Sequence, residues 1–330
     1  MVVMAPSGDI AVQQRDLILI STILMLLIIV PVIFLTLLFA WRYRQSNTEA
    51  EYDPDWHHST RLEVVIWSAP LMIIIMLGAV TWISTHKLDP FRPLDRIDDT
   101  RPVAADVKPL TVQVVALDWK WLFVYPEQGI ATVNELAAPV DRPIDFQITS
   151  SSVMNSFFVP ALAGQIYAMP GMQTQLHAVI NKPGEFEGFS ANYSGAGFSD
   201  MRFKFHGLAQ ADFDQWVAKV KADGGALGRT EYTALAKPSI AEPVRHFSSV
   251  EDGLFQAILN MCTAPGKMCM SEMMHIDMTG GAGKESHENR ERLIYDDRSA
   301  TGTPAHADGD MTGMDMSGGQ MNHGAAEPGK

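Results

Sequence analysis

The residues of this sequence with the clearest capacity for chemistry are soft metal donors near its C-terminal end. The last part of the chain contains Met311, Met314, Met316 and Met321, with His306 and His323. An earlier group consists of Met268, Cys269, Met270, Met273, Met274 and His275. Thioether, thiolate and imidazole donors suit Cu(I), so one hypothesis is that this region binds copper. The alternative is a solvated terminus of biased composition that binds no metal.

The two cysteines leave a separate question open. Cys262 and Cys269 are the only cysteines of the chain, which is too few for a disulfide framework. One bridge is permitted in an oxidising compartment. Two unpaired thiols are the equal alternative.

The charge balance excludes one class of partner. The net charge is −13, from 38 acidic and 25 basic residues. Because no basic cluster offers a surface to phosphates, nucleic acid is not an expected partner. Hydrophobic residues make up 47% of the 330 residues, and many of them gather in two runs.

These two apolar runs are long enough to cross a membrane. Residues 17–39 and 64–84 contain no charged side chain. At about 1.5 Å per residue, each helix would span about 30 Å, the thickness of the hydrocarbon core of a bilayer. Soluble helices of this length have polar faces, which these runs lack. We therefore predict transmembrane helices over 15–44 and 61–86, joined by a polar hairpin over 45–60.

The rest of the chain divides where composition and periodicity change. Residues 1–14 form a short N-terminal segment, and the proline-containing stretch 87–109 suits a linker. Short alternating strands separated by turns predict a β-sandwich or barrel over 110–211. Apolar residues at helical spacing predict a helical region over 212–280. Residues 281–330 lack any period and are predicted to be disordered.

One predicted strand is unusually aromatic. Trp119, Trp121, Phe123 and Tyr125 share one face at a period of two. We expect this face to pack in the core of the β-domain.

Four stretches of the chain resemble subunit II of bo-type ubiquinol oxidases, which belong to the haem-copper oxidase superfamily. They lie at 118–121, 125–135, 153–158 and 165–169, and the first reads Asp-Trp-Lys-Trp. The resemblance runs from about residue 14 to about residue 221 and hardly covers the tail. It implies that the β-domain has a cupredoxin-like fold.

The resemblance also gives a meaning to the loop over 188–201. In copper-bearing relatives the corresponding loop has the form Cys-x-Glu-x-Cys-x-x-x-His-x-x-Met and, with a His from an earlier strand, holds a dinuclear copper. The matching positions of this chain are Asn155, Ser190, Asn192, Ser194, Phe198 and Met201. Two bridged coppers need thiolates together with imidazole and thioether donors. The resemblance thus implies a vacated site in which only Met201 is retained, and no cofactor in this chain.

The role implied by the resemblance is that of a non-redox subunit II of a proton-pumping ubiquinol oxidase. Subunit I would carry the haems and a copper, and ubiquinol would be the substrate of the complex. The expected partners are subunit I, smaller subunits III and IV and the lipid bilayer, without cytochrome c. The chain would lie in the bacterial inner membrane, with residues 1–14 and the C-terminal domain in the periplasm. Whether a lipid is attached near the N-terminus stays open.

Glu63 is the one residue for which the resemblance implies a closer part in the reaction. It occupies the position where oxidases of this superfamily have an acid at the mouth of a proton channel in subunit I. A carboxylate at the cytoplasmic edge of a helix can collect protons from water and pass them inward. The alternative is that Glu63 marks the interfacial end of the helix, balanced by Arg61.

Two other functions are alternatives to this one. A copper-bearing subunit II of cytochrome c oxidase would need thiolates where Ser190 and Ser194 stand. A membrane-tethered copper-binding protein, from a different class, would act through the methionines and histidines of its tail.

Overall fold

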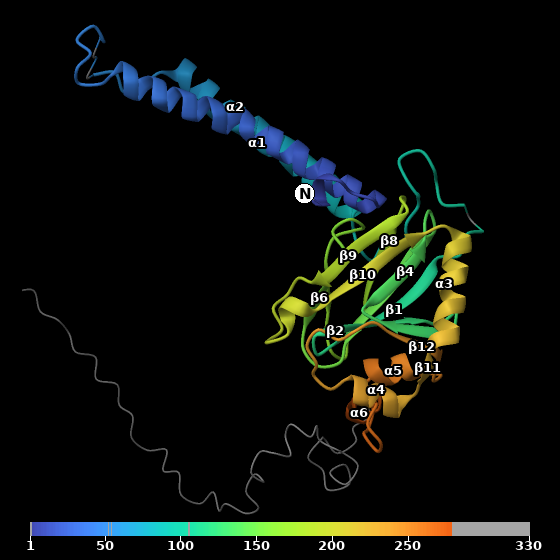
Figure 1. Cartoon of the computed structure of the whole chain (residues 1–330). Coiled ribbons are helices and arrows are strands. Elements are labelled where there is room, and N and C mark those ends of the chain that lie inside the picture. Colours follow the sequence, from blue (N-terminus) through green and yellow to red (C-terminus); the bar gives the residue numbers. More distant parts are fainter. Residues whose placement is uncertain (1, 52, 54, 105, 279–330) are drawn as a thin grey trace, which may run out of the picture.

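The computed structural model describes residues 2–278, except 52, 54 and 105. The segment 281–330, predicted to be disordered, and its methionines and histidines lie outside the described residues. Within the described part, two long helices lead into a β-rich domain followed by short helices (Figure 1). The predicted architecture of an apolar helical hairpin before a β-sandwich is thereby confirmed.

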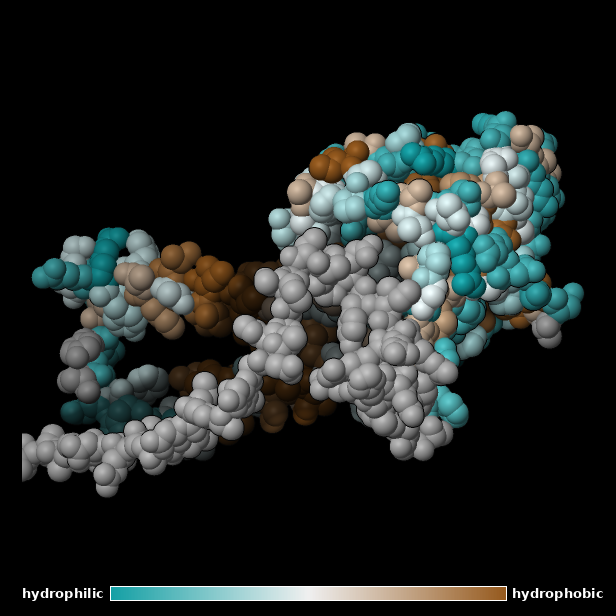
Figure 2. All heavy atoms as spheres, turned by 90° about the horizontal axis from the view of Figure 1, so that it is seen from below, coloured by the Kyte–Doolittle hydropathy of each residue, from teal (hydrophilic) through white to brown (hydrophobic). Residues whose placement is uncertain are grey.

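The two long helices expose an apolar surface along their length. They are α1 (Asp9–Arg42) and α2 (Thr60–Lys87), which lie side by side, after a short η1 (Val2–Met4). Ile73 is the only buried residue of α2. Figure 2 shows this apolar surface bounded by polar residues at the hairpin. Both helices have the length and composition of membrane spans, and lipid would cover such a surface.

The first turn of α1 is attached to the β-domain, and α1 therefore begins earlier than the predicted 15–44. Gly8 forms an isolated β-bridge with Ile180, and its N–H donates to the Ala161 carbonyl oxygen over 2.9 Å. A Cβ at Gly8 would lie only 2.5 Å from the carbonyl oxygen of Val179, so this close approach requires glycine. The carboxylate of Asp9 is buried and accepts two 3.0 Å hydrogen bonds from Arg96 of the linker.

The β-domain consists of two sheets. The larger has the order β11-β12-β3-β2-β1-β5-β8 and the smaller the order β4-β10-β9-β6-β7. The strands of the larger sheet are β1 (Leu110–Leu117), β2 (Lys120–Tyr125), β3 (Ile130–Val133), β5 (Pro143–Ser150), β8 (Thr174–Val179), β11 (Gly225–Leu227) and β12 (Arg245–Val250). Those of the smaller are β4 (Glu135–Pro139), β6 (Asn155–Phe158), β7 (Ile166–Ala168), β9 (Gly184–Ser190) and β10 (Arg202–Leu208). Strand β1 pairs antiparallel with β2 and parallel with β5.

The main core lies between the two sheets and is rich in aromatic rings. Trp121, Phe123 and Tyr125 of β2 point into it, as their period of two predicts. Phe157 and Phe203 come from the smaller sheet and stack with ring centroids 5.5 Å apart. The intervening β2 residues face a second core under the C-terminal helices. Because β2 is buried on both faces, its sequence is almost continuously apolar.

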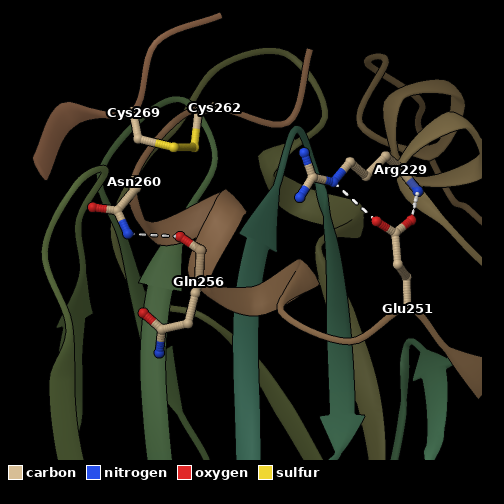
Figure 3. The surroundings of a disulfide bond; sticks show 6 residues. All are labelled: Arg229, Glu251, Gln256, Asn260, Cys262 and Cys269. Atoms are coloured by element: carbon tan, nitrogen blue, oxygen red, sulfur yellow. Dashed lines mark hydrogen bonds and ion pairs between the residues drawn. A yellow bond between two sulfur atoms is a disulfide. The ribbon is translucent and has the colours of Figure 1, made fainter. Parts of the chain in front are cut away.

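The C-terminal region contains helices and also two strands that the sequence pattern does not predict. The helices are α3 (Gln210–Asp223), α4 (Arg229–Leu235), α5 (Leu254–Leu259) and α6 (Met270–Met278). Strands β11 and β12 extend the larger sheet beyond β3. The pattern of β12, Arg-His-Phe-Ser-Ser-Val, contains little apolar alternation, which explains why it was missed. Cys262 and Cys269 form a disulfide (Figure 3).

Candidate functional site

The loop that follows β9 brings three of the predicted positions together. Ser190 is the last residue of β9, Asn155 is the first of β6, and Met201 directly precedes β10. The Ser190 hydroxyl donates to Asn155 Oδ1 over 3.1 Å, and the Ser190 N–H donates to the Met201 carbonyl oxygen over 3.1 Å. These three positions hold copper ligands in the copper-bearing proteins that this loop resembles. Here they are adjacent, and Ser190 is hydrogen-bonded to both of the others.

The two carboxamides of the site bond the neighbouring backbone. Asn155 Nδ2 donates to the Val153 carbonyl oxygen over 3.1 Å, and Asn192 Nδ2 donates to that of Met154 over 3.3 Å. The Asn192 side chain thus gives the Met154 carbonyl a donor. The Asn155 side chain adds a second donor to the Val153 carbonyl, to which the Ser150 hydroxyl also donates.

The side chains of Met201 and Phe198 contact apolar groups. Met201 is fully buried and belongs to the core between the sheets. Phe198, in η2 (Phe198–Asp200), packs edge-on against Tyr193 with ring centroids 5.6 Å apart. Two hydroxyls, two carboxamides, a phenyl ring and a core thioether do not make a dinuclear copper site. No cluster of three or more His, Cys, Asp or Glu among the described residues is arranged to hold a metal.

Trp119 fills the space under this loop. Its Nε1–H donates to the Ser194 carbonyl oxygen over 3.0 Å. A Cβ at Gly197 would lie 2.5 Å from the indole, and Gly195 adopts a φ of 115°, so both glycines allow the loop to close over the ring. Trp119 itself has a φ of 63° in the turn between β1 and β2. Of the four aromatic residues expected on one core face, Trp119 alone packs at its edge, under the loop.

Glu63 lies in the first turn of α2, at the hairpin end. Its Oε1 is 2.7 Å from Nδ1 of His58, and its side chain is 42% exposed. The sequence suggested Arg61 as the balancing group, but the contact in the structure is with His58. Glu63 is thus a partly exposed acid beside an imidazole at the start of α2. Figure 1 shows the hairpin between α1 and α2 at the end of these helices far from the β-domain.

A segment at 237–246 crosses the β-domain and is held by polar residues that sequence reasoning missed. Lys120 is almost fully buried, and its Nζ donates to the Lys237 carbonyl oxygen over 2.7 Å and to Ser239 Oγ over 2.6 Å. Burial lowers the pKa of Lys120. Asn134 Nδ2 donates to the Glu242 carbonyl oxygen over 2.8 Å. A lone lysine between two tryptophans in an apolar strand was the signal available in the sequence.

Glu135, in β4, gathers three donors from separate elements. Oε1 lies 3.3 Å from Nε2 of His206 in β10, and Oε2 lies 2.8 Å from Nε2 of His246 in β12. Trp216 of α3 donates from Nε1 to Oε2 over 3.2 Å. Burial alone would raise the pKa of Glu135, but the hydrogen bonds from these groups outweigh it and lower the pKa to about 2. These residues are far apart in the sequence, so no local pattern predicts the cluster.

Two family models match the β-rich part of the chain. "Cytochrome C oxidase subunit II, periplasmic domain" matches residues 127–206. "COX Aromatic Rich Motif" matches residues 221–266. The second match extends the likeness past residue 221, where the motifs read from the sequence ended.

Curated relatives match most of the chain. The "Cytochrome bo(3) ubiquinol oxidase subunit 2" of Pseudomonas aeruginosa is 57% identical over 77% of this chain and 74% of its own length. The protein of the same name from Pseudomonas putida is 55% identical over 77% of this chain and 78% of its own length. The "Ubiquinol oxidase subunit 2" of Acetobacter aceti is 53% identical over 78% of this chain and 81% of its own length.

Proposed function

The chain belongs to the ubiquinol oxidase subunit 2 family, and on that premise we propose that it is the subunit of a respiratory oxidase that carries no electrons itself. Ubiquinol would be oxidised within the membrane and oxygen reduced at haems and a copper held by subunit I. The present chain would stabilise that complex and place a folded domain at the membrane surface.

We call the loop at 188–201 the filled loop, because hydrogen-bonded side chains stand where copper ligands would and the indole of Trp119 packs beneath it. This loop is the observation that carries the proposal. A copper relay takes electrons from a water-soluble carrier, whereas ubiquinol arrives through the lipid. Ser190 and Asn155 share a hydrogen bond where such a relay would need thiolate and imidazole, and Trp119 occupies the space beneath. The alternative of a copper-bearing cytochrome c oxidase subunit is therefore not favoured.

The two helices and the disulfide support a proposed membrane arrangement. We propose that α1 and α2 span the bacterial inner membrane with the β-domain in the periplasm. A disulfide between Cys262 and Cys269 persists in an oxidising compartment, which supports that side of the membrane. The exposed apolar faces of α1 and α2 would contact lipid and subunit I, with subunits III and IV as further partners.

Purification of the complex through a tag on this chain tests the proposal. We expect a haem-bearing subunit to co-purify, ubiquinol to be oxidised, reduced cytochrome c not to be oxidised, and no paramagnetic signal of a dinuclear copper. Oxidation of cytochrome c, or such a copper signal, would contradict it. Isolation of the chain without any haem-bearing partner would instead favour a membrane-tethered copper protein.

We further propose that Glu63 helps protons enter subunit I. Its carboxylate lies at the hairpin end of α2, is partly exposed and contacts His58, a second group able to exchange protons. Such a pair could pass protons from water toward a neighbouring subunit.

Substitution of Glu63 separates this role from a merely interfacial one. We expect Glu63→Ala to lower turnover of the assembled oxidase several-fold without changing its haem content. Glu51→Ala, which removes an exposed acid of the same hairpin, is the matched control and should leave turnover unchanged. An unchanged rate in Glu63→Ala would end the proposal for this residue.

A further inference from the structure

Two methionine sulfurs converge beside Gly171, and one of them belongs to Met270 in α6. Figure 1 shows α6 at the end of the β-domain away from the long helices. The sulfurs of Met270 and Met261 lie 3.2 and 3.7 Å from the point where a Cβ of Gly171 would sit. They are therefore at most about 7 Å apart, the sum of these two distances. The missing side chain at Gly171, whose φ is 71°, leaves the room that both sulfurs occupy.

The local backbone holds the two thioethers at this place. The Cys262–Cys269 disulfide ties the residue after Met261 to the residue before Met270 (Figure 3). The Met270 N–H donates to the Asn260 carbonyl oxygen over 2.9 Å. Met261 has a φ of 56°, a conformation that costs energy for a residue other than glycine. Such strain is often found where a side chain is held for a function.

A third thioether stands one helical turn away. Met274 follows Met270 by four residues in α6, so the two share a face of the helix. The Met274 side chain is 56% exposed, which gives solvent access to the group. The two cysteine sulfurs are bonded to each other, so the thioethers are the free soft donors at this place.

We propose that Met261, Met270 and Met274 form a binding site for Cu(I). Thioethers prefer this soft ion over Zn²⁺ or Mg²⁺. If the Cu(I)–thioether bond is as long as a zinc–thiolate bond, about 2.3 Å, two ligating sulfurs must lie within about 4.6 Å of each other. Methionine has three rotatable side-chain bonds, so rotation of Met261 and Met270 can close the remaining gap without moving the backbone.

This site is separate from the filled loop and from the electron path. It lies beside α5 and α6 rather than between β9 and β10, and it needs no change in oxidation state of the bound ion. The proposal is also independent of the methionines and histidines at 306–323, which lie outside the described residues.

Anaerobic Cu(I) titration of the purified complex against a coloured Cu(I) chelator tests the site. The complex would be used with its full chain and again with the chain ended after Met278. We expect Met261→Leu/Met270→Leu to weaken one binding event at least tenfold in both forms. Met154→Leu, an exposed methionine elsewhere on the domain, should leave the affinity unchanged.

Further measurements test whether misfolding or binding to other ligands explains a loss of Cu(I) affinity. Leucine conserves volume, so the double variant should keep its melting temperature and quinol oxidation rate. Cu(I) absorption spectroscopy should show sulfur ligands, and the affinity should be constant between pH 8 and pH 5 because thioethers bind no proton. Equal affinity in the double variant, or loss of all binding on removal of the residues after Met278, would overturn the proposal.

Discussion

The two ends of the β9–β10 hairpin both bury polar groups, and they do so in opposite ways. At the loop end, Ser190 bonds Asn155 and the indole of Trp119 bonds a backbone carbonyl, so every partner is neutral. At the other end, where His206 lies opposite Glu185, an ionised Glu135 bonds two imidazoles. Neutral hydrogen bonds keep their strength as pH changes, whereas charge-assisted ones are stronger but depend on protonation. The loop end is thus stabilised by packing and neutral hydrogen bonds, and the opposite end by charge-assisted hydrogen bonds.

Removal of the indole under the loop should have the largest effect. We expect Trp119→Ala to lower the free energy of unfolding by about 3 kcal/mol, because it leaves a cavity and an unpaired carbonyl at Ser194. Urea unfolding of the purified chain in detergent would measure this. Tyr193→Ala, which truncates a side chain that is 75% exposed, is the control and should cost much less. Equal losses in the two variants would show that the loop does not depend on the indole.

Neutralising the charged end should cost somewhat less. We expect Glu135→Gln to lower the free energy of unfolding by about 2 kcal/mol at neutral pH, because the amide cannot accept from both imidazoles and the indole as the carboxylate does. The control is Glu187→Gln, whose carboxylate forms an exposed ion pair with Arg202 and should contribute less than about 1 kcal/mol. If both substitutions cost the same, the Glu135 cluster is no stronger than a surface pair.

The pH dependence distinguishes the two ends more directly. Because the folded chain lowers the pKa of Glu135 from 4.5 to about 2, its contribution is complete above pH 4.5 and is lost as pH falls toward 2. Stability curves for the native chain and Glu135→Gln should therefore converge below pH 4.5. The Trp119→Ala difference should stay constant over the same range. Parallel curves for Glu135→Gln would contradict the assignment of charge to this end.

A single neutral hydrogen bond in the loop should matter least. We expect Ser190→Ala to cost about 1 kcal/mol, since Asn155 Oδ1 then loses its donor while the loop backbone remains. Ser199→Ala, an exposed hydroxyl in the same loop, should change stability by less than about 0.5 kcal/mol. A larger loss in Ser190→Ala than in Trp119→Ala would reverse the proposed order of contributions in the loop.

Local sequence pattern was enough to predict the two long helices and the core-facing side chains of β2. Uncharged runs predicted α1 and α2, and the period of two placed Trp121, Phe123 and Tyr125 in the core. The resemblance identified the positions around Ser190, which the structure brings together.

Contacts between distant segments were not predictable in this way. In the sequence, Lys120 only interrupts an apolar strand. In the structure, the backbone of 237–239 covers it and accepts its hydrogen bond. Glu135, His206 and His246 are ordinary residues in sequence and become one cluster only when three strands meet. The early start of α1 likewise depends on a surface formed by residues 161–181.

The attachment of Gly8 to Ile180 has a consequence for the order of biosynthesis. The residues around Gly8 are synthesised before both long helices, yet their partners Ala161 and Ile180 are synthesised only after them. This attachment can form only after residue 180 has been synthesised, and only when both segments are on the same side of the membrane. It closes a ring that contains both helices, so a helix inserted in the wrong direction would leave Gly8 and Asp9 without their partners.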